Sequence, residues 1–80
     1  MAKFEVGKYY ESYGGYDPIL VERRTNKTIW VYNGSIEWRM RIKHDSDGNE
    51  FVTDSIVPAK WREAFTYNAK WECDYKHKED

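Results

Sequence analysis

Residues 27–42 read KTIWVYNGSIEWRMRI, two runs rich in β-branched and aromatic residues joined by Asn33 and Gly34. An Asn-Gly pair between such runs predicts a β-hairpin, because a two-residue type I′ turn needs positive φ at both central positions and these residues tolerate it. Such a turn sets the register of the two strands. The predicted pairs are Val31 with Ile36, Trp30 with Glu37, Ile29 with Trp38 and Thr28 with Arg39.

Strand parity divides this hairpin into an apolar face and a polar face, because successive side chains point to opposite sides of a strand. The apolar face is the predicted core: Ile29, Val31, Ile36, Trp38, Met40 and Ile42. The other face carries rings and charges together: Thr28, Trp30, Tyr32, Glu37, Arg39 and Arg41. Glu22 and Arg24 of the preceding strand are expected to extend it.

Alternation from Phe4 through Val6 to Tyr10 predicts a short first strand interrupted by Gly7. A second strand is expected over 19–24. A three-residue turn at 25–27 sets Val21 opposite Val31 and Arg23 opposite Ile29, which keeps more apolar side chains on one face than a two-residue turn.

A tyrosine-rich loop is predicted over residues 9–18, where paired glycines and an Asp-Pro step disfavour regular structure. Its rings are Tyr9, Tyr10, Tyr13 and Tyr16. Two interpretations stay open. Either the rings cover one end of a small barrel, or they form a recognition loop, since Tyr with Gly offers a large, rigid contact area at low entropic cost.

The second half of the chain predicts a turn at 45–49 and a return strand at 51–53, with either Phe51 or Val52 facing inward. Pro58 and the 61, 64, 65 spacing favour a short helix over 58–65 that plugs the barrel. Unbroken alternation over 65–75 predicts a long last strand with Cys73 on its inner face, followed by a disordered tail from about residue 77. Short strands with frequent turn signals and one short helix predict a mainly β fold, a small antiparallel SH3-like barrel of five to six strands, although an OB-like topology is also compatible.

Composition excludes several classes of protein. The 80 residues suffice for one small domain, and 13 basic against 14 acidic residues give a net charge of −1, which does not favour nucleic acid or an anionic membrane. The single cysteine excludes an internal disulfide, and the opening residues lack a signal-peptide core, so we expect a cytoplasmic protein. No run approaches the roughly 18 apolar residues of a membrane span.

Catalytic motifs are missing from the sequence. His44 and His77 are far apart, and there is no nucleophile elbow, phosphate loop, His-Glu-x-x-His or paired Cys-x-x-Cys. We therefore expect no enzyme activity, no metal and no cofactor.

Four segments, FEVGKYY (4–10), ILVERRTNKTIWV (19–31), WRMRI (38–42) and GNEFV (48–52), resemble small uncharacterised SH3-like barrel proteins of Gram-positive gut bacteria, their phages and their conjugative elements. The shared motifs are a Phe-x-x-Gly-x-x-Tyr opening and an Arg-Thr-x-Lys-Thr step, which here fall on Phe4, Gly7, Tyr10, Arg24, Thr25, Lys27 and Thr28. The resemblance implies a compact β-barrel. It implies no activity, and Trp30 and the segment from Pro58 onward depart from the pattern.

We predict a non-catalytic binding module that contacts a protein partner through an aromatic and basic face. The candidate residues are Trp30, Tyr32, Arg24, Arg39, Arg41, Tyr13 and Tyr16. Rings among guanidinium groups are also how proteins stack bases and neutralise phosphates, so nucleic acid is the alternative ligand. The same side chains could instead stabilise the sheet through cross-strand pairs, or form a homodimer contact. A phage-borne inhibitor of a host enzyme, an SH3-type site for Pro-rich peptides, and a monomer or weak homodimer are all compatible with the sequence.

Overall fold

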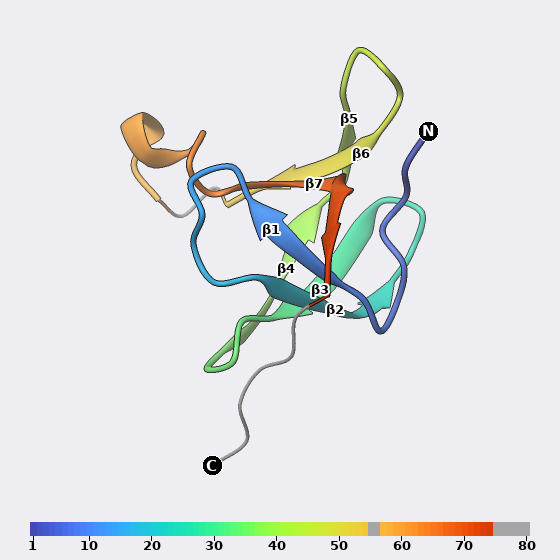
Figure 1. Cartoon of the computed structure of the whole chain (residues 1–80), viewed down its shortest axis with the longest axis horizontal. Helices are drawn as coiled ribbons and strands as arrows, with labels where there is room; N and C mark the ends of the chain where they lie inside the picture. Colours follow the sequence, from blue (N-terminus) through green and yellow to red (C-terminus); the bar gives the residue numbers. More distant parts are fainter. Residues whose placement is uncertain (55–56, 75–80) are drawn as a thin grey trace.

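The computed structural model describes residues 1–54 and 57–74, which form a mainly β fold (Figure 1). Its strands are β1 (Tyr9–Ser12), β2 (Ile19–Arg24), β3 (Thr28–Tyr32), β4 (Glu37–Arg41), β5 (Lys43–His44), β6 (Glu50–Thr53) and β7 (Thr66–Cys73), with one 3-10 turn, η1 (Ala59–Trp61). The predicted class, a mainly β, small antiparallel barrel, is confirmed, with seven strands in the described residues instead of five to six and a single 3-10 turn in place of the predicted short helix. The predicted tail from residue 77 lies outside the described residues.

One sheet runs in the order β4-β3-β2-β1-β7-β6-β5. Its two end strands, β4 and β5, are consecutive in the chain and separated only by Ile42, whose N–H donates to the Lys27 carbonyl at 2.7 Å. The bent segment 37–44 therefore pairs with β3 in its first half and with β6 in its second, which nearly closes the sheet into a barrel (Figure 1). A seam without strand pairing in the described residues remains between β4 and β6.

The β3–β4 turn is longer than predicted. Tyr32 pairs with Glu37, so four residues, 33–36, form the turn. The Asn33 side-chain oxygen accepts hydrogen bonds from the N–H groups of Ser35 and Ile36, both at 2.9 Å. This local bonding competes with the two-residue turn that Asn-Gly favours.

The register therefore differs from the predicted one by two residues, a shift that preserves side-chain parity. The predicted core side chains of the hairpin are buried, apart from Trp38, which is partly buried against the core, and Ile36, which lies in the turn and is 57% exposed. The prediction for Ile36 was wrong because it assumed the shorter turn.

A bulge interrupts the pairing of β2 with β3. Val21 pairs with Val31 as predicted, but the register shifts between Val21 and Arg23, so Arg23 pairs with Trp30 and Arg24 with Ile29. A bulge adds one residue to one strand and exchanges the sides of all later side chains. The prediction that Arg23 is opposite Ile29, with Arg24 on the outer face, was wrong for this reason.

The N-terminal segment does not form the predicted strand, because β1 begins only at Tyr9. Phe4 and Tyr10 are nonetheless buried, with their rings edge to face at 4.8 Å between centroids. Val6 is exposed, and the chain turns at Gly7, where φ is +89°. The irregular tyrosine loop is therefore 13–18 and not 9–18.

The 45–49 turn forms as predicted, and Lys43 pairs with Phe51 beyond it. Asp45 Oδ1 accepts the N–H groups of Asp47 and Asn49, each at 2.9 Å. Val52 faces the core and is fully buried, which settles the register left open by the sequence.

The last strand follows the predicted alternation only in part. Tyr67 and Ala69 are buried as predicted, but Asn68 between them is buried too, although it was expected to face outward. The pairing with β1 then shifts, so that Glu72 and not Cys73 pairs with the buried Tyr10. Cys73 pairs with Tyr9 and is only partly buried, which contradicts its predicted inward position. The predicted helix is the single turn η1, and none of its residues is buried.

Candidate functional site

Arg24 lies apart from the other predicted site residues. Its guanidinium donates to both carboxylate oxygens of Glu50, at 2.7 and 2.9 Å, and to the Phe4 carbonyl at 2.7 Å. The Phe4 N–H donates to Glu50 Oε1 at 2.8 Å. Burial alone would raise the pKa of Glu50, but these donors hold it below its usual value of 4.5. Arg24 is therefore a structural residue that fixes the N-terminal segment.

The polar surface of the β3–β4 hairpin, here named the Trp30 face, is built largely as predicted. Its residues are Arg23, Trp30, Tyr32, Glu37, Arg39 and Arg41, which share one side of the sheet by pairing and parity. Trp30 pairs directly with Arg39. The Arg23 guanidinium lies over the Trp30 ring, 4.0 Å from its centroid, within the range of a cation–π contact. One face of the Trp30 ring is thus already covered by the protein's own cation.

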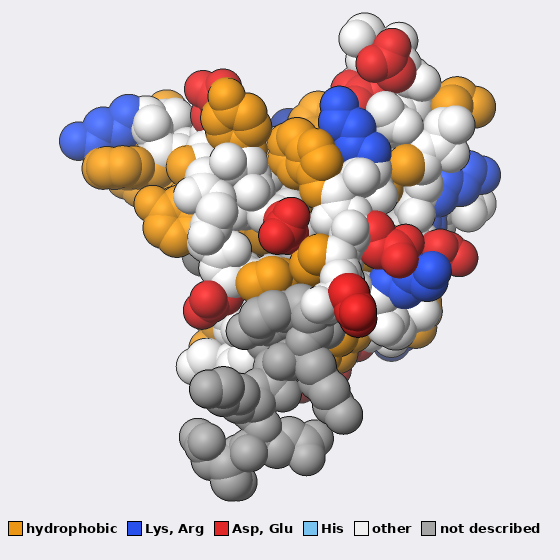
Figure 2. Space-filling model, viewed as in Figure 1, with side chains coloured by type: hydrophobic (Ala, Val, Ile, Leu, Met, Phe, Trp, Pro, Cys, Tyr) orange, Lys and Arg blue, Asp and Glu red, His pale blue; other side chains and the backbone are white. Residues whose placement is uncertain are grey.

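A second surface brings the tyrosine loop against the segment that contains η1. Tyr16 stacks on Phe65, with ring centroids 4.2 Å apart and planes 10° from parallel. These rings border an apolar hollow of about 280 Å³, here named the aromatic hollow, lined by Tyr16, Val57, Pro58, Trp61 and Phe65. Figure 2 shows apolar side chains gathered on this lobe of the molecule, at the left of the view. Trp61 and Tyr16 remain 48% and 43% exposed.

Backbone hydrogen bonds fix the loop that carries Tyr16. The Gly14 N–H donates to the Ala64 carbonyl at 3.0 Å, and the Tyr16 N–H donates to Ser12 Oγ at 2.8 Å. Gly14 packs so closely that an added Cβ would lie 2.7 Å from the Ala64 Cβ. Only glycine fits this approach, so the loop and the 62–65 turn are held as one unit.

Tyr13, the other loop residue predicted for the site, lines no part of the aromatic hollow. Its ring lies 6.1 Å from that of Trp71 and is 62% exposed. The Lys70 ammonium lies 5.7 Å from the Trp71 ring centroid. Tyr13 is therefore an exposed neighbour of Trp71 and not part of the aromatic hollow.

Carboxylates lie close to the same end of the barrel. Burial, and to a smaller extent the negative charges of Asp54 and Asp17, raise the pKa of Tyr67 to about 12. Tyr67 is 4% exposed, and Asp17 follows the stacked Tyr16. The aromatic hollow thus has the Asp17 carboxylate next to its Tyr16 side. On its Trp61 side lies Lys60, whose ammonium is 5.7 Å from the Trp61 ring centroid.

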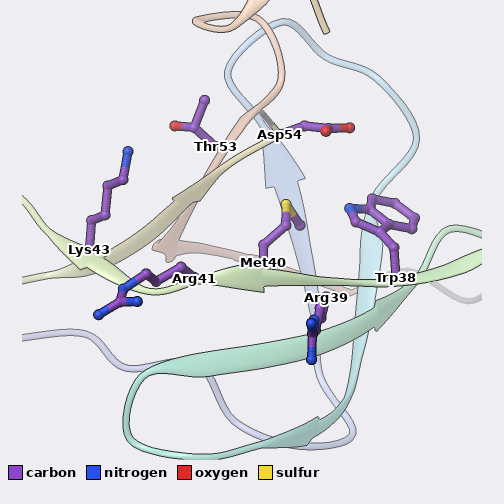
Figure 3. A pocket seen from close by; sticks show the side chains of 7 residues that line it. All are labelled: Trp38, Arg39, Met40, Arg41, Lys43, Thr53 and Asp54. Atoms are coloured by element: carbon purple, nitrogen blue, oxygen red, sulfur yellow. The ribbon is translucent and has the colours of Figure 1, made fainter. Parts of the chain in front are cut away.

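A third surface lies along the seam between β4 and β6 (Figure 3). A hollow of about 460 Å³, here named the seam hollow, is lined by Trp38, Arg39, Met40, Arg41, Lys43, Thr53 and Asp54. Trp38 and Met40 project into it from β4, whereas the Arg39 side chain projects to the opposite side of the strand (Figure 3). The indole N–H of Trp38 is buried and has no hydrogen-bond acceptor among residues 1–54 and 57–74. An unmet buried donor costs about 1–3 kcal/mol.

The chemistry of Cys73 does not favour a nucleophile. Burial raises the pKa of its thiol, and the nearby carboxylates of Glu11, Asp74 and Glu72 raise it further. Activated cysteines have the reverse environment, with cations that lower the pKa. Lys8, which lines a pocket with Cys73, is engaged by Glu72 at 3.3 Å.

Within the described part of the chain, no group of three His, Cys, Asp or Glu side chains is arranged to hold a metal ion. Nor is any described helix long and apolar enough to span a membrane. No protein-family model matches this sequence, and no curated protein or solved structure shows significant similarity to it. The resemblance to gut-bacterial SH3-like proteins therefore stays a prediction.

Sequence reasoning missed Trp61, Phe65, Pro58 and Val57 as members of a candidate site, because the helical spacing of 61, 64 and 65 suggested a buried face. A signal was nevertheless present. Proline and a run of charged residues surround Trp61, which is more typical of an exposed turn than of a buried plug.

Proposed function

We propose that this protein is a non-catalytic binding module and that its protein partner docks on the aromatic hollow. The observation that carries the proposal is the exposed Tyr16–Phe65 stack, which with half-exposed Trp61 borders an apolar depression. Tyr and Trp dominate the binding energy of many protein interfaces, since they bury a large area with few rotatable bonds.

Preorganisation supports the same function. Ordering a mobile side chain on binding costs about 0.5–1.5 kcal/mol, so a surface that is already ordered binds more tightly. Here the Tyr16 N–H is bound by Ser12, the Gly14 N–H is bound by Ala64, and the Tyr16 ring is stacked. The partner therefore meets a fixed ring geometry.

The Trp30 face is the less favoured surface. Its ring is engaged by Arg23, and Glu37 lies on the same side as Arg39 and Arg41. These contacts match cross-strand pairs that stabilise an exposed sheet. Nucleic-acid binding at this face is kept as the competing proposal. The proposed setting is the cytoplasm of a Gram-positive bacterium or one of its mobile elements, an assignment that rests on the single cysteine and on the sequence resemblance.

Affinity purification from extracts of a Gram-positive host tests the proposed function. Tyr16→Ala and Trp61→Ala should release a captured partner, whereas Tyr32→Ala and Trp30→Ala, matched substitutions on the Trp30 face, should retain it. Thermal unfolding of all four variants checks that each one is folded. The proposal would be contradicted if Tyr32→Ala and Trp30→Ala released the partner while Tyr16→Ala and Trp61→Ala retained it.

A further inference from the structure

The β4 edge offers backbone hydrogen-bonding groups to the seam. Antiparallel pairs alternate between bonded and non-bonded residues, and the bonds at both ends of this ladder are known: Ile42 N–H to the Lys27 carbonyl and Asn33 N–H to the Ile36 carbonyl. Trp38 and Met40 therefore bond to β3. The N–H and C=O groups of the intervening residues, among them Arg39 and Arg41, point away from β3 and toward the seam.

On the opposite wall of the seam, on the side away from β7, β6 pairs with no strand beyond the short β5 within residues 1–54 and 57–74. The β5–β6 ladder ends where Lys43 pairs with Phe51. Two residues further, Arg41 and Thr53 would pair if the ladder continued, but they instead line the seam hollow. At this fork β4 and β6 diverge without pairing as strands, so the edge of β4 that faces the seam is left without a strand partner among residues 1–54 and 57–74.

Side-chain alternation along β4 specifies what could complement it. Met40 is buried and Trp38 is partly buried on the core side, while Arg39 and Arg41 are exposed on the other. A strand laid beside β4 would place every second side chain against Trp38 and Met40, and the remaining ones against the two arginines. Apolar residues suit the first set and acidic residues suit the second.

We propose that the seam is a second binding site, which accepts an extended segment of a partner protein with alternating apolar and acidic residues as an added strand on β4. The charge of the lining supports an acidic occupant, because Arg39, Arg41 and Lys43 are cationic and Asp54 is the one acidic lining residue. The volume of about 460 Å³ falls within the range of ligand pockets. Strand addition is an established mode of peptide recognition, in which main-chain bonds supply affinity and alternate pockets supply specificity.

A fluorescein-labelled peptide Glu-Val-Glu-Val-Thr, complementary to β4 in antiparallel register, tests this site by fluorescence anisotropy. The peptide should bind the full-length protein more tightly than Lys-Val-Lys-Val-Thr, and methylation of its backbone nitrogens should weaken binding by about tenfold or more, the equivalent of one to two lost hydrogen bonds. Equal binding of the acidic, basic and methylated peptides, or no binding at about millimolar protein, would overturn the proposal.

Arg39→Pro removes one seam-facing N–H without removing a bond to β3, and edge strands accept proline at such positions. It should weaken peptide binding by about tenfold. Arg39→Ala, the matched control that keeps the N–H, should lose only about two- to fivefold. Equal losses in both variants would overturn strand addition. The methylated peptide gives the same test on unmodified protein if Arg39→Pro does not fold.

Two further measurements separate this site from other occupants. Trp61→Ala, which alters the aromatic hollow, should leave binding of the acidic peptide unchanged, so failure of the proposed function and failure of this inference are distinguishable. Sedimentation across a concentration series should show a monomer. If the protein is instead a dimer and Arg39→Pro dissociates it, then the β4 edge binds a second copy of the chain, and the peptide proposal is overturned.

Discussion

Arg24 and Glu50 form a bidentate ion pair between β2 and β6, with Nη1 to Oε1 at 2.7 Å and Nη2 to Oε2 at 2.9 Å. The Glu50 side chain is 4% exposed and that of Arg24 is 21% exposed. Both residues also bond to the backbone of Phe4, so one pair joins two strands and the N-terminal segment.

Arg24→Ala should destabilise the protein by about 3–5 kcal/mol, because it leaves the Glu50 carboxylate buried without its counterion. Urea denaturation measures the loss. Arg23→Ala is the matched control, since it removes an exposed cation over Trp30 and should cost about 0.5–1 kcal/mol. Equal losses in the two variants would show that the Arg24–Glu50 pair does not hold the N-terminal segment.

Acid should unfold the protein through the carboxylates of Asp45 and Glu50. Burial would raise the pKa of Asp45, but the Asn49 backbone N–H, the Asn68 and Asn49 side-chain amides and the Asp47 backbone N–H outweigh it and lower that pKa to about 2. The unfolded chain, with pKa values near 4, therefore binds more protons than the native state at low pH. This contribution to stability is present above about pH 4 and is lost as the pH falls toward 2.

The free energy of unfolding, measured in urea from pH 6 to pH 2, checks this dependence. Asp45→Asn should flatten the fall between about pH 4 and 2, because the substituted side chain no longer titrates. An unchanged slope in this variant would contradict the assignment to the 45–49 turn.

Gly14→Ala should open the aromatic hollow. Its Cβ would lie 2.7 Å from the Ala64 Cβ and 2.9 Å from the Ala64 carbonyl oxygen, so the loop must move away from the 62–65 turn. We expect thermal unfolding to show a loss of about 1–3 kcal/mol in the free energy of unfolding, and a lower affinity for any partner bound at Tyr16. Adding Ala64→Gly should restore part of the stability and part of the affinity, since it removes one of the two clashing atoms. Full stability in the single variant would contradict the close approach.

Oligonucleotides should bind weakly at most, because Arg23 already covers one face of Trp30 and the chain carries a net charge of −1. Titration of single-stranded DNA and RNA at low salt, followed by Trp fluorescence, measures this. Salt-sensitive micromolar binding that is lost on combining Arg39→Ala with Arg41→Ala would favour the nucleic-acid proposal over the protein-binding one.

The sequence predicted the barrel class and most of its core because strand parity is robust to even register shifts. The β3–β4 turn is two residues longer than the Asn-Gly signal suggests, and yet Ile29, Val31 and Met40 remain inside. A register shift by an odd number of residues instead moves side chains to the other face of the sheet. The bulge in β2 carries no Gly or Pro to mark it, and it moved Arg24 from the predicted outer face to Glu50.

The candidate site was only partly predictable. Tyr16 was expected to contribute to recognition, but its partner Phe65 is 49 residues further along the chain, and only the folded loop brings the two rings together. The helical spacing around Trp61 also suggested burial, whereas a single 3-10 turn leaves the ring half exposed. Contacts between distant loops depend on tertiary packing that local patterns do not encode.

Site-specific photocrosslinking tests most directly whether the aromatic hollow is the protein-docking surface. A photoreactive phenylalanine replaces either Trp61 or, as the control, Ile36, which is 57% exposed in the β3–β4 turn. Each full-length protein is irradiated in cells of a Gram-positive host, and the adducts are identified by mass spectrometry. We expect one dominant protein adduct from position 61 that is absent from position 36. An excess of unmodified protein, added as a competitor, should suppress this adduct. The same excess of the Tyr16→Ala variant should not suppress it. The same adducts from both positions, or none from position 61, would contradict the assignment of the aromatic hollow as the binding site.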